Sequence, residues 1–405
     1  GAGLFSELAA STTLKKIHLD GCSSDAAAAA SFGNIANSNS LEVLVVEDCC
    51  DSLLLPAVPS HLTDLKVIGR DSWLAILQPE HTPHLTKLKF EDTTDTTEWC
   101  CQLPESFNWQ LLHSLHTLKL HNTGIDQQAL DLLLQHGPHL DTLAVHHFDL
   151  TEDRTAAPCS WRVLELREHD STSLMRSACA RLPLHSVQSV ELEGMWNWLQ
   201  LEDGDIPETI EEATAMVAAG ARNLAGSPGG RELLQAKQTI YADGEYSEEE
   251  REDWVIAMLT GLAPLAAAGM TRFELLIEHD DITEAIVEAM HASLGTCLAY
   301  LELGSDGGTT YDPAVWPTLC STLPALQELV VYVAEDDDIT PLVDLCLQMP
   351  HPLRLVLHGM EPARMAQLVQ TVQASGPSQV AVKSLTAWDE ENMYKQRAKS
   401  TSADN

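Results

Sequence analysis

The chain has 405 residues, of which 60 are acidic and 23 are basic, and its formal net charge is -37 at pH 7. This negative charge argues against general nucleic-acid binding and against docking on anionic lipid, because both need a basic surface. It favours proteins with basic surfaces as partners, or a surface whose charge serves only solvation. No run of about 18 apolar residues occurs, so the sequence predicts no membrane span.

A six-residue phrase, Leu-x-x-Leu-x-Leu or a close variant, recurs about every 21 to 30 residues. Its copies begin at Leu14, Leu41, Leu62, Leu85, Leu115, Leu140, Trp161 and Val187, and again at Met270, Leu298, Leu326, Pro352 and Val382. A period of this size predicts stacked units, each with one strand and one return segment that cannot bury its apolar side alone. Residues 4–11 are expected to form a return helix ahead of the first strand, so we expect the chain to begin inside the array.

The phrase resembles the leucine-rich repeat family over residues 14–390. The resemblance implies an α/β fold, a leucine-rich-repeat solenoid with a curved parallel sheet on the concave side and helices and irregular returns on the convex side. It implies about 12–13 repeats and a surface for display rather than for chemistry. Three residues after the last Leu, the family usually places Asn or Cys at a turn. Cys22 and Cys49 stand there and are expected to be structural turn positions.

Return helices are predicted where apolar residues recur at helical spacing. The segments are 26–32, 126–136, 175–182, 207–223, 283–294, 341–349 and 362–375. The unit from Leu115 to His139 is the most regular, and it resembles the ribonuclease-inhibitor-like subclass of the family. Gly137-Pro138 is expected to end its helix.

The rhythm breaks once, between Val187 and Met270. We therefore predict N-terminal leucine-rich repeats at 1–195, an acidic and partly helical insertion at 196–262, C-terminal repeats at 263–389, and a polar, disordered tail at 390–405. Long insertions in repeat arrays often carry binding, so 196–262 is a candidate partner surface. A loosely packed surface loop is the alternative.

The outward residue between the two inner Leu positions of each strand gives a sharper prediction. Strands of a sheet lie about 4.8 Å apart, so equivalent residues should form columns across the array. Lys66, Lys89 and Lys119 would form a basic column, and Glu165, Glu191, Glu274 and Glu302 an acidic one. Like charges on neighbouring strands repel, and a partner of opposite charge would relieve the repulsion. The alternative is diagonal pairing, of Glu91 with Lys66 or Lys89 and of Arg167 with Glu165 or Glu191.

Two further groups lie on outward strand positions. Tyr300, Tyr332 and Trp388 are candidate partner-binding residues, because Tyr and Trp are enriched in binding hot spots; packing on their neighbours is the alternative. His116, His121, His146 and His147 cluster between the charge columns and could bind metal or sense pH. Without a carboxylate or Cys at ligand spacing, we interpret them as solvated surface histidines.

The sequence shows no phosphate-binding loop, no zinc-protease motif and no nucleophile motif, so we expect neither an enzyme nor a cofactor. Ten cysteines without a Cys-x-x-Cys spacing indicate reduced thiols and an intracellular, cytoplasmic place, with a cytoskeletal or organellar assembly also possible. We predict a non-catalytic interaction scaffold, a structural subunit of a larger assembly that binds partners through the concave face and the insertion. The alternatives are the substrate-recognition subunit of an F-box ubiquitin ligase, although no F-box pattern is present, and a Ran-type GTPase-activating regulator.

Overall fold

The computed structural model describes residues 2–21, 31–47, 55–69, 72–92, 101–103, 107–150, 159–168, 182, 184–197, 209–225, 233–241, 247–278, 281–295, 297–304, 310–333, 340–375 and 380–385. Cys22, Cys49, Trp388 and the tail 390–405 lie outside these residues. The fold is mixed α/β with parallel sheets. It divides into unit 1, Gly1–Glu168 with Ser177–Val190, and unit 2, His169–Arg176 with Glu191–Asn405. These limits differ from the predicted boundaries after residues 195 and 262.

In unit 1 the strands of one sheet follow one another in chain order, and all are parallel. They are β1 (Lys16–Asp20), β2 (Val43–Glu47), β3 (Asp64–Gly69), β4 (Lys87–Asp92), β6 (Thr117–Asp126), β7 (Thr142–Asp149) and β8 (Val163–Glu168). The short β5 (Cys101–Gln102) pairs with the far end of β6. Strand β9 (Ser189–Asn197) begins in this unit.

A repeated hydrogen-bond pattern sets the register of these strands. At each step, two consecutive amides donate to one carbonyl of the preceding copy; Glu42 N and Val43 N, for example, both lie 2.9 Å from the Lys15 oxygen. The acceptors are Lys15, Glu42, Thr63, Thr86, His116, Asp141 and Arg162. Each follows the first apolar residue of a copy, so the predicted strand alignment is confirmed across unit 1.

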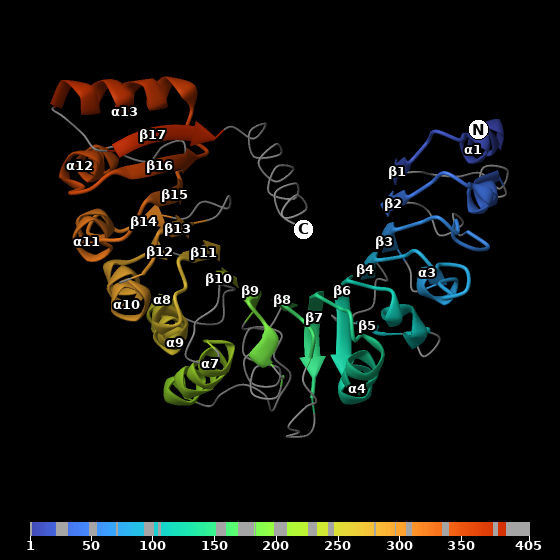
Figure 1. Ribbon diagram of the computed structural model, residues 1–405. Helices are drawn as coiled ribbons and strands as arrows, with labels where there is room; N and C mark the ends of the chain where they lie inside the picture. The colour runs from blue at the N-terminus through green and yellow to red at the C-terminus, as the bar shows by residue number, and fades with distance from the viewer. Residues whose placement is uncertain are drawn as a thin grey trace. The chain divides into compact units, whose positions relative to one another are not determined.

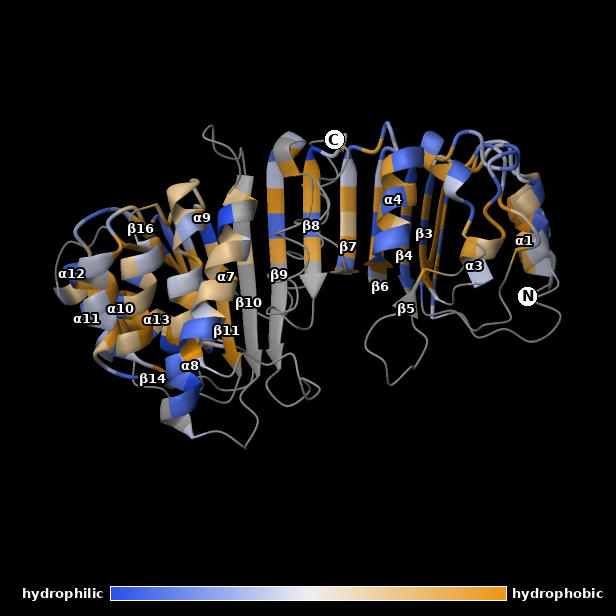
Figure 2. Ribbon diagram, turned by 90° about the horizontal axis from the view of Figure 1, so that it is seen from below, coloured by the Kyte–Doolittle hydropathy of each residue, from blue (hydrophilic) through white to orange (hydrophobic). Residues whose placement is uncertain are grey.

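Strand side chains alternate between two environments, as a period of two requires. In β2, Leu44 and Val46 are buried against the return segments, while Val43 and Val45 are partly exposed on the other face. Figure 2 shows the same alternation as hydrophobic and hydrophilic bands along β8. The phrase therefore builds one apolar layer between strands and returns, and it leaves the opposite strand face for other side chains.

The return segments of unit 1 are short helices on one side of the strands, as Figure 1 shows for α1, α3 and α4. They are α1 (Ala2–Ala10), η1 (Gly33–Asn37), α3 (Ser72–Ala75), η2 (Trp109–His113), α4 (Gln127–His136) and η4 (Leu184–Ser186). Helix α4 matches its prediction. Asp126 caps it by accepting a hydrogen bond from Ala129 N at 2.7 Å. It ends before Gly137, where a Cβ would lie 2.8 Å from the Leu133 oxygen.

Unit 2 has a parallel sheet in the order β10, β11, β13, β15, β16 and β17. The bounds are β10 (Leu233–Tyr241), β11 (Arg272–Glu278), β13 (Tyr300–Leu303), β15 (Glu328–Tyr332), β16 (Leu353–His358) and β17 (Val380–Leu385). The returns are α7 (Ile210–Ala225), α8 (Glu248–Gly261), α9 (Ala263–Ala267), α10 (Glu284–Leu294), α11 (Val315–Thr322), α12 (Thr340–Gln348) and α13 (Pro362–Ser375). A second parallel pair joins β12 (Asp281–Ile282) to β14 (Thr310–Tyr311). Helices α8, α10, α11 and α12 lie on one side of the strands (Figure 1).

The prediction that 196–262 is an insertion outside the sheet is wrong, although α7 and α8 make it partly helical as expected. Strand β10 lies within it and pairs with β11, so that Ala236 stands beside Phe273 and Gln238 beside Leu275. The segment therefore contains one more copy, starting at Leu233. That copy was hidden because Ala and Gln replace the two inner Leu residues.

The last copy is also corrected by the structure. Val382 pairs with Leu355, not with Pro352, so the strand begins three residues earlier than the phrase predicts. Lys383 then stands beside Val356. The alternation of Val380 and Val382 sets this register, and the Val382–Leu385 spacing obscured it.

No helix among the described residues is long and apolar enough to cross a membrane.

Candidate interaction surfaces

The basic column predicted in unit 1 is confirmed as a row of register partners. Lys66 stands beside Lys89, and Lys89 beside Lys119. The same row continues through Ala144 to Glu165. The strand pairing thus brings together four of the predicted site residues.

Carboxylates meet this column at both ends. Glu47 accepts from the Lys66 ammonium and lies 2.9 Å from His18 Nε2. At the other end, Lys119 Nζ donates to both oxygens of Glu165, at 2.7 and 3.0 Å. That contact crosses β7 above the small side chain of Ala144. Lys66 thus pairs with Glu47 and not with Glu91, which was one of the two pairings that the diagonal alternative offered for Glu91. The Arg167 side chain lies outside the described part.

Two carboxyl groups near lysines of unit 1 have pKa values shifted in opposite directions. Burial raises the pKa of Glu47, but the hydrogen bonds and charges of Lys66 and His18 outweigh it, and the pKa falls below its ordinary value. Burial also raises the pKa of Asp64, and here the charges of Lys87 and Lys16 offset it only in part, so the pKa stays above its ordinary value. The pKa shifts differ in sign because Glu47 hydrogen-bonds to Lys66 directly, whereas Asp64 has no hydrogen bond to either of its lysines.

In unit 2 the predicted acidic column is only two residues long. Glu274 stands beside Glu302 as expected, and the row then continues to Val330 and Val356. On the other side of Glu274 the register position belongs to Lys237, not to Glu191. The expected contact of Glu191 with Glu274 is therefore wrong, because β10 pairs with β11 at that position.

The two glutamates belong to a tyrosine–carboxylate cluster, which we define as Arg272, Glu274, Tyr300, Glu302 and Tyr332. Arg272 donates from Nε and Nη2 to one oxygen of Glu274, at 3.0 and 2.6 Å. Its guanidinium carbon lies 3.7 Å from the centre of the Tyr300 ring, a cation–π contact. The hydroxyls of Tyr300 and Tyr332 each donate to one oxygen of Glu302, the latter at 3.0 Å. Glu302 is only 5% exposed, so these donors replace its water.

The phenol of Tyr300 is held in its neutral form. Burial raises the pKa of Tyr300 far above its ordinary value, the charge of Glu302 adds to the effect, and Arg272 opposes it. The hydroxyl therefore remains a hydrogen-bond donor at neutral pH.

Tyr300 and Tyr332 do occupy outward strand positions, but they are half-buried rather than exposed. Tyr300 packs against Val330 and Val356. The ring of Tyr332 stacks on His358, with centroids 4.5 Å apart. Both hydroxyls and both rings thus contact neighbouring side chains, as the packing alternative expects, and both residues remain partly exposed.

The histidine prediction is wrong for two of its four members. His121 is 6% and His146 4% exposed, so they are buried and not solvated, whereas His116 is exposed. Among the described residues, no group of three or more His, Cys, Asp or Glu side chains is placed to hold a metal ion.

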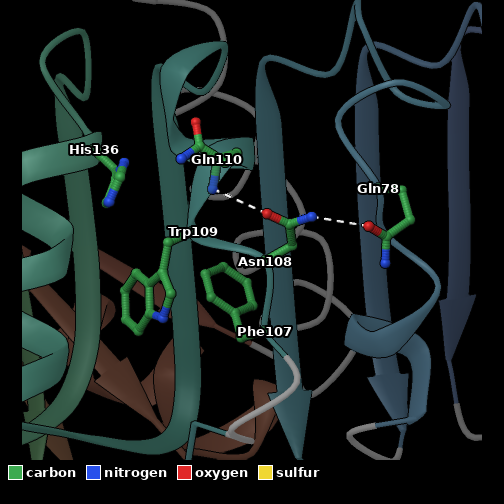
Figure 3. A pocket seen from close by; sticks show the side chains of 6 residues that line it. All are labelled: Gln78, Phe107, Asn108, Trp109, Gln110 and His136. Atoms are coloured by element: carbon green, nitrogen blue, oxygen red, sulfur yellow. Dashed lines mark hydrogen bonds between the residues drawn. The ribbon is translucent and has the colours of Figure 1, made fainter.

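Unit 1 also has a hollow of about 470 Å³ on its return side (Figure 3). It is lined by Gln78, Phe107, Asn108, Trp109, Gln110 and His136. Asn108 accepts from Gln110 N at 3.1 Å and donates to Gln78 Oε1 at 2.8 Å, so its amide ties η2 to the preceding return. These six residues include neither a carboxylate nor a hydroxyl nucleophile. The hydrogen bonds of Asn108 cap η2, so we assign these side chains a structural role. Asn before a helical turn was the sequence signal for it.

No protein-family model matches the chain, and a comparison with curated proteins finds no match.

Proposed function

We propose that the chain is a leucine-rich-repeat solenoid that serves as a non-catalytic scaffold for protein–protein interaction, within a larger intracellular assembly. The strand register supports this proposal most strongly. It aligns equivalent positions of successive copies, so outward side chains form rows across each unit. Surfaces built from such rows suit an extended partner, because each copy adds a similar patch beside the last.

The tyrosine–carboxylate cluster supports a recognition role for the strand face of unit 2. Its side chains are already fixed by contacts among themselves, so a partner would lose little entropy in ordering them. Half-buried aromatic rings beside fixed charges are typical of the anchors of interfaces. Partners with basic surfaces remain our expectation, because the net charge of -37 would attract them and repel acidic proteins.

The proposal is tested by chemical crosslinking of the native protein in its own cells, followed by purification at low and high salt and mass spectrometry. We expect stoichiometric partners with crosslinks to the strand faces or to 209–260. Ubiquitin-ligase components among them would favour the substrate-receptor alternative. Recovery of the protein alone at both salt concentrations would contradict a scaffold role.

A further inference from the structure

A groove of about 540 Å³ lies between α7 and α8 in unit 2. The two helices are in close contact at Gly261, where a Cβ would lie 2.6 Å from Val217 Cβ and 3.1 Å from the Thr214 oxygen. Only a residue without a side chain allows this approach. Because the contact fixes α7 against α8, the groove beside it is a formed feature of the unit.

Apolar side chains form part of the groove lining. Ala257 is buried, and Ile210 and Ile256 are half-buried along it, with Trp254 on the same turns of α8. Thr214 and Thr260 donate their hydroxyls to backbone oxygens of their own helices, each at 2.8 Å. The hydroxyl hydrogens of both threonines are therefore used within their own helices.

Two carboxylates, Glu211 and Asp253, line the groove, and both side chains are exposed. Within the part of the chain that the structure describes, neither has a hydrogen bond or an ion pair. None of the nine described lining residues is basic. The contrast with Glu250 is informative, because Ser247 hydrogen bonds lower the pKa of that carboxyl and its charge belongs to the capping box of α8. Asp253 has no such part in the capping of α8.

We propose that the α7–α8 groove receives a basic segment of a partner protein. An apolar side chain of that segment would cover Ile210, Ile256 and Ala257, and Lys or Arg side chains would reach Glu211 and Asp253. Charge complementarity selects this occupant: an acidic segment would meet two carboxylates with no basic residue in the lining, whereas a cation also gains from the aromatic ring of Trp254. This inference rests on the proposed scaffold function and assigns it a surface and a partner chemistry.

The test uses the full chain and a synthetic amphipathic helical peptide of Leu and Arg that carries a photoreactive group. A second peptide with Glu in place of Arg controls for the apolar side. Binding is measured by fluorescence anisotropy for the wild type, for Glu211→Gln/Asp253→Asn, and for Asp344→Asn/Glu361→Gln. The last variant is matched, because it removes two exposed carboxylates from α12 and from the residue before α13 and gives the same net charge.

We expect the Arg peptide to bind the wild type and to photocrosslink to α7 and α8, with Kd raised about tenfold by the groove variant and less than about twofold by the matched variant. Equal Kd values for the two variants, crosslinks confined to other elements, or no binding by the wild type at about 1 mM peptide would overturn the inference.

The same variants separate this inference from the scaffold proposal. If the native purification recovers stoichiometric partners and Glu211→Gln/Asp253→Asn retains them all, the groove inference fails and the scaffold function stands. If no partner is recovered, the scaffold function fails, whatever the peptide does.

Discussion

The strand faces of the two units use the same register position in different ways. In unit 1 the row of Lys66, Lys89 and Lys119 is balanced by the long side chains of Glu47 and Glu165. In unit 2 the row holds Glu302, whose carboxylate accepts hydrogen bonds from two neutral phenol hydroxyls. Glu165 and Glu302 are both buried, at 8% and 5% exposure, but the donor of Glu165 is the Lys119 side chain, which is 27% exposed. A cation that keeps access to water loses little without its counter-ion, whereas half-buried phenol hydroxyls need their acceptor.

The largest expected difference between the two faces follows from removing a carboxylate. Glu302→Ala leaves two half-buried phenol hydroxyls without their acceptor, and it should lower the free energy of unfolding by about 2–3 kcal/mol. Glu165→Ala frees only the Lys119 ammonium, which water can reach, so the loss should stay below about 1 kcal/mol. Urea unfolding of the full chain measures both, and hydrogen exchange in β13 and β8 locates each effect. Equal losses would contradict the distinction between the faces.

Sequence reasoning predicted the rows of this comparison but not the contacts across them. The Leu phrase fixes which residues point inward, so the neighbours Lys66–Lys89–Lys119 and Glu274–Glu302 followed from spacing alone. The Lys119–Glu165 contact depends on the small Ala144 between them, and the Tyr332–Glu302 bond joins residues of different rows. Such contacts depend on side-chain size and reach, which the repeat period does not contain.

The missed copy in unit 2 has a different physical cause. A return helix of 16 residues, α7, precedes β10, and a helix of 14 residues, α8, follows it. In β10 the two inner positions hold Ala236, which is buried, and Gln238. Pairing with β11 determines this strand more than its own apolar residues do, so the pattern of the segment alone could not predict it.

Within unit 1, the ionisation of Glu47 and that of Asp64 should have opposite effects on stability as the pH changes. The pKa of Glu47 is lowered in the folded state, so its stabilisation is present above the unfolded value, near 4.5, and is lost as pH falls through the lower folded pKa. The pKa of Asp64 is raised, so its ionised form destabilises the fold above that pKa, and the penalty vanishes as pH falls below the unfolded value near 3.8.

Glu47→Gln should therefore lower the free energy of unfolding at pH 7 by about 1 kcal/mol and have little effect near pH 3. Asp64→Asn should raise it at pH 7, by less than about 1 kcal/mol, and also have little effect near pH 3. Urea unfolding of both variants over this pH range is the measurement. If both variants changed the free energy of unfolding in the same direction at pH 7, the opposite pKa shifts of Glu47 and Asp64 would be contradicted.

The smallest expected effect, and the most specific, is the response to salt. A double-mutant cycle with Lys119→Met and Glu165→Gln should give a coupling energy of about 0.5–1 kcal/mol at low salt, because the pair is partly exposed. Raising the ionic strength to about 1 M shortens the screening length to about 3 Å, so this coupling should fall by about half or more. The matching cycle with Tyr332→Phe and Glu302→Gln should change by less than about 0.3 kcal/mol, because the phenol carries no charge and burial keeps the screening ions away from the Glu302 carboxylate. A strong salt response in the tyrosine cycle would mean that ions reach Glu302. It would contradict the distinction between the strand faces of the two units.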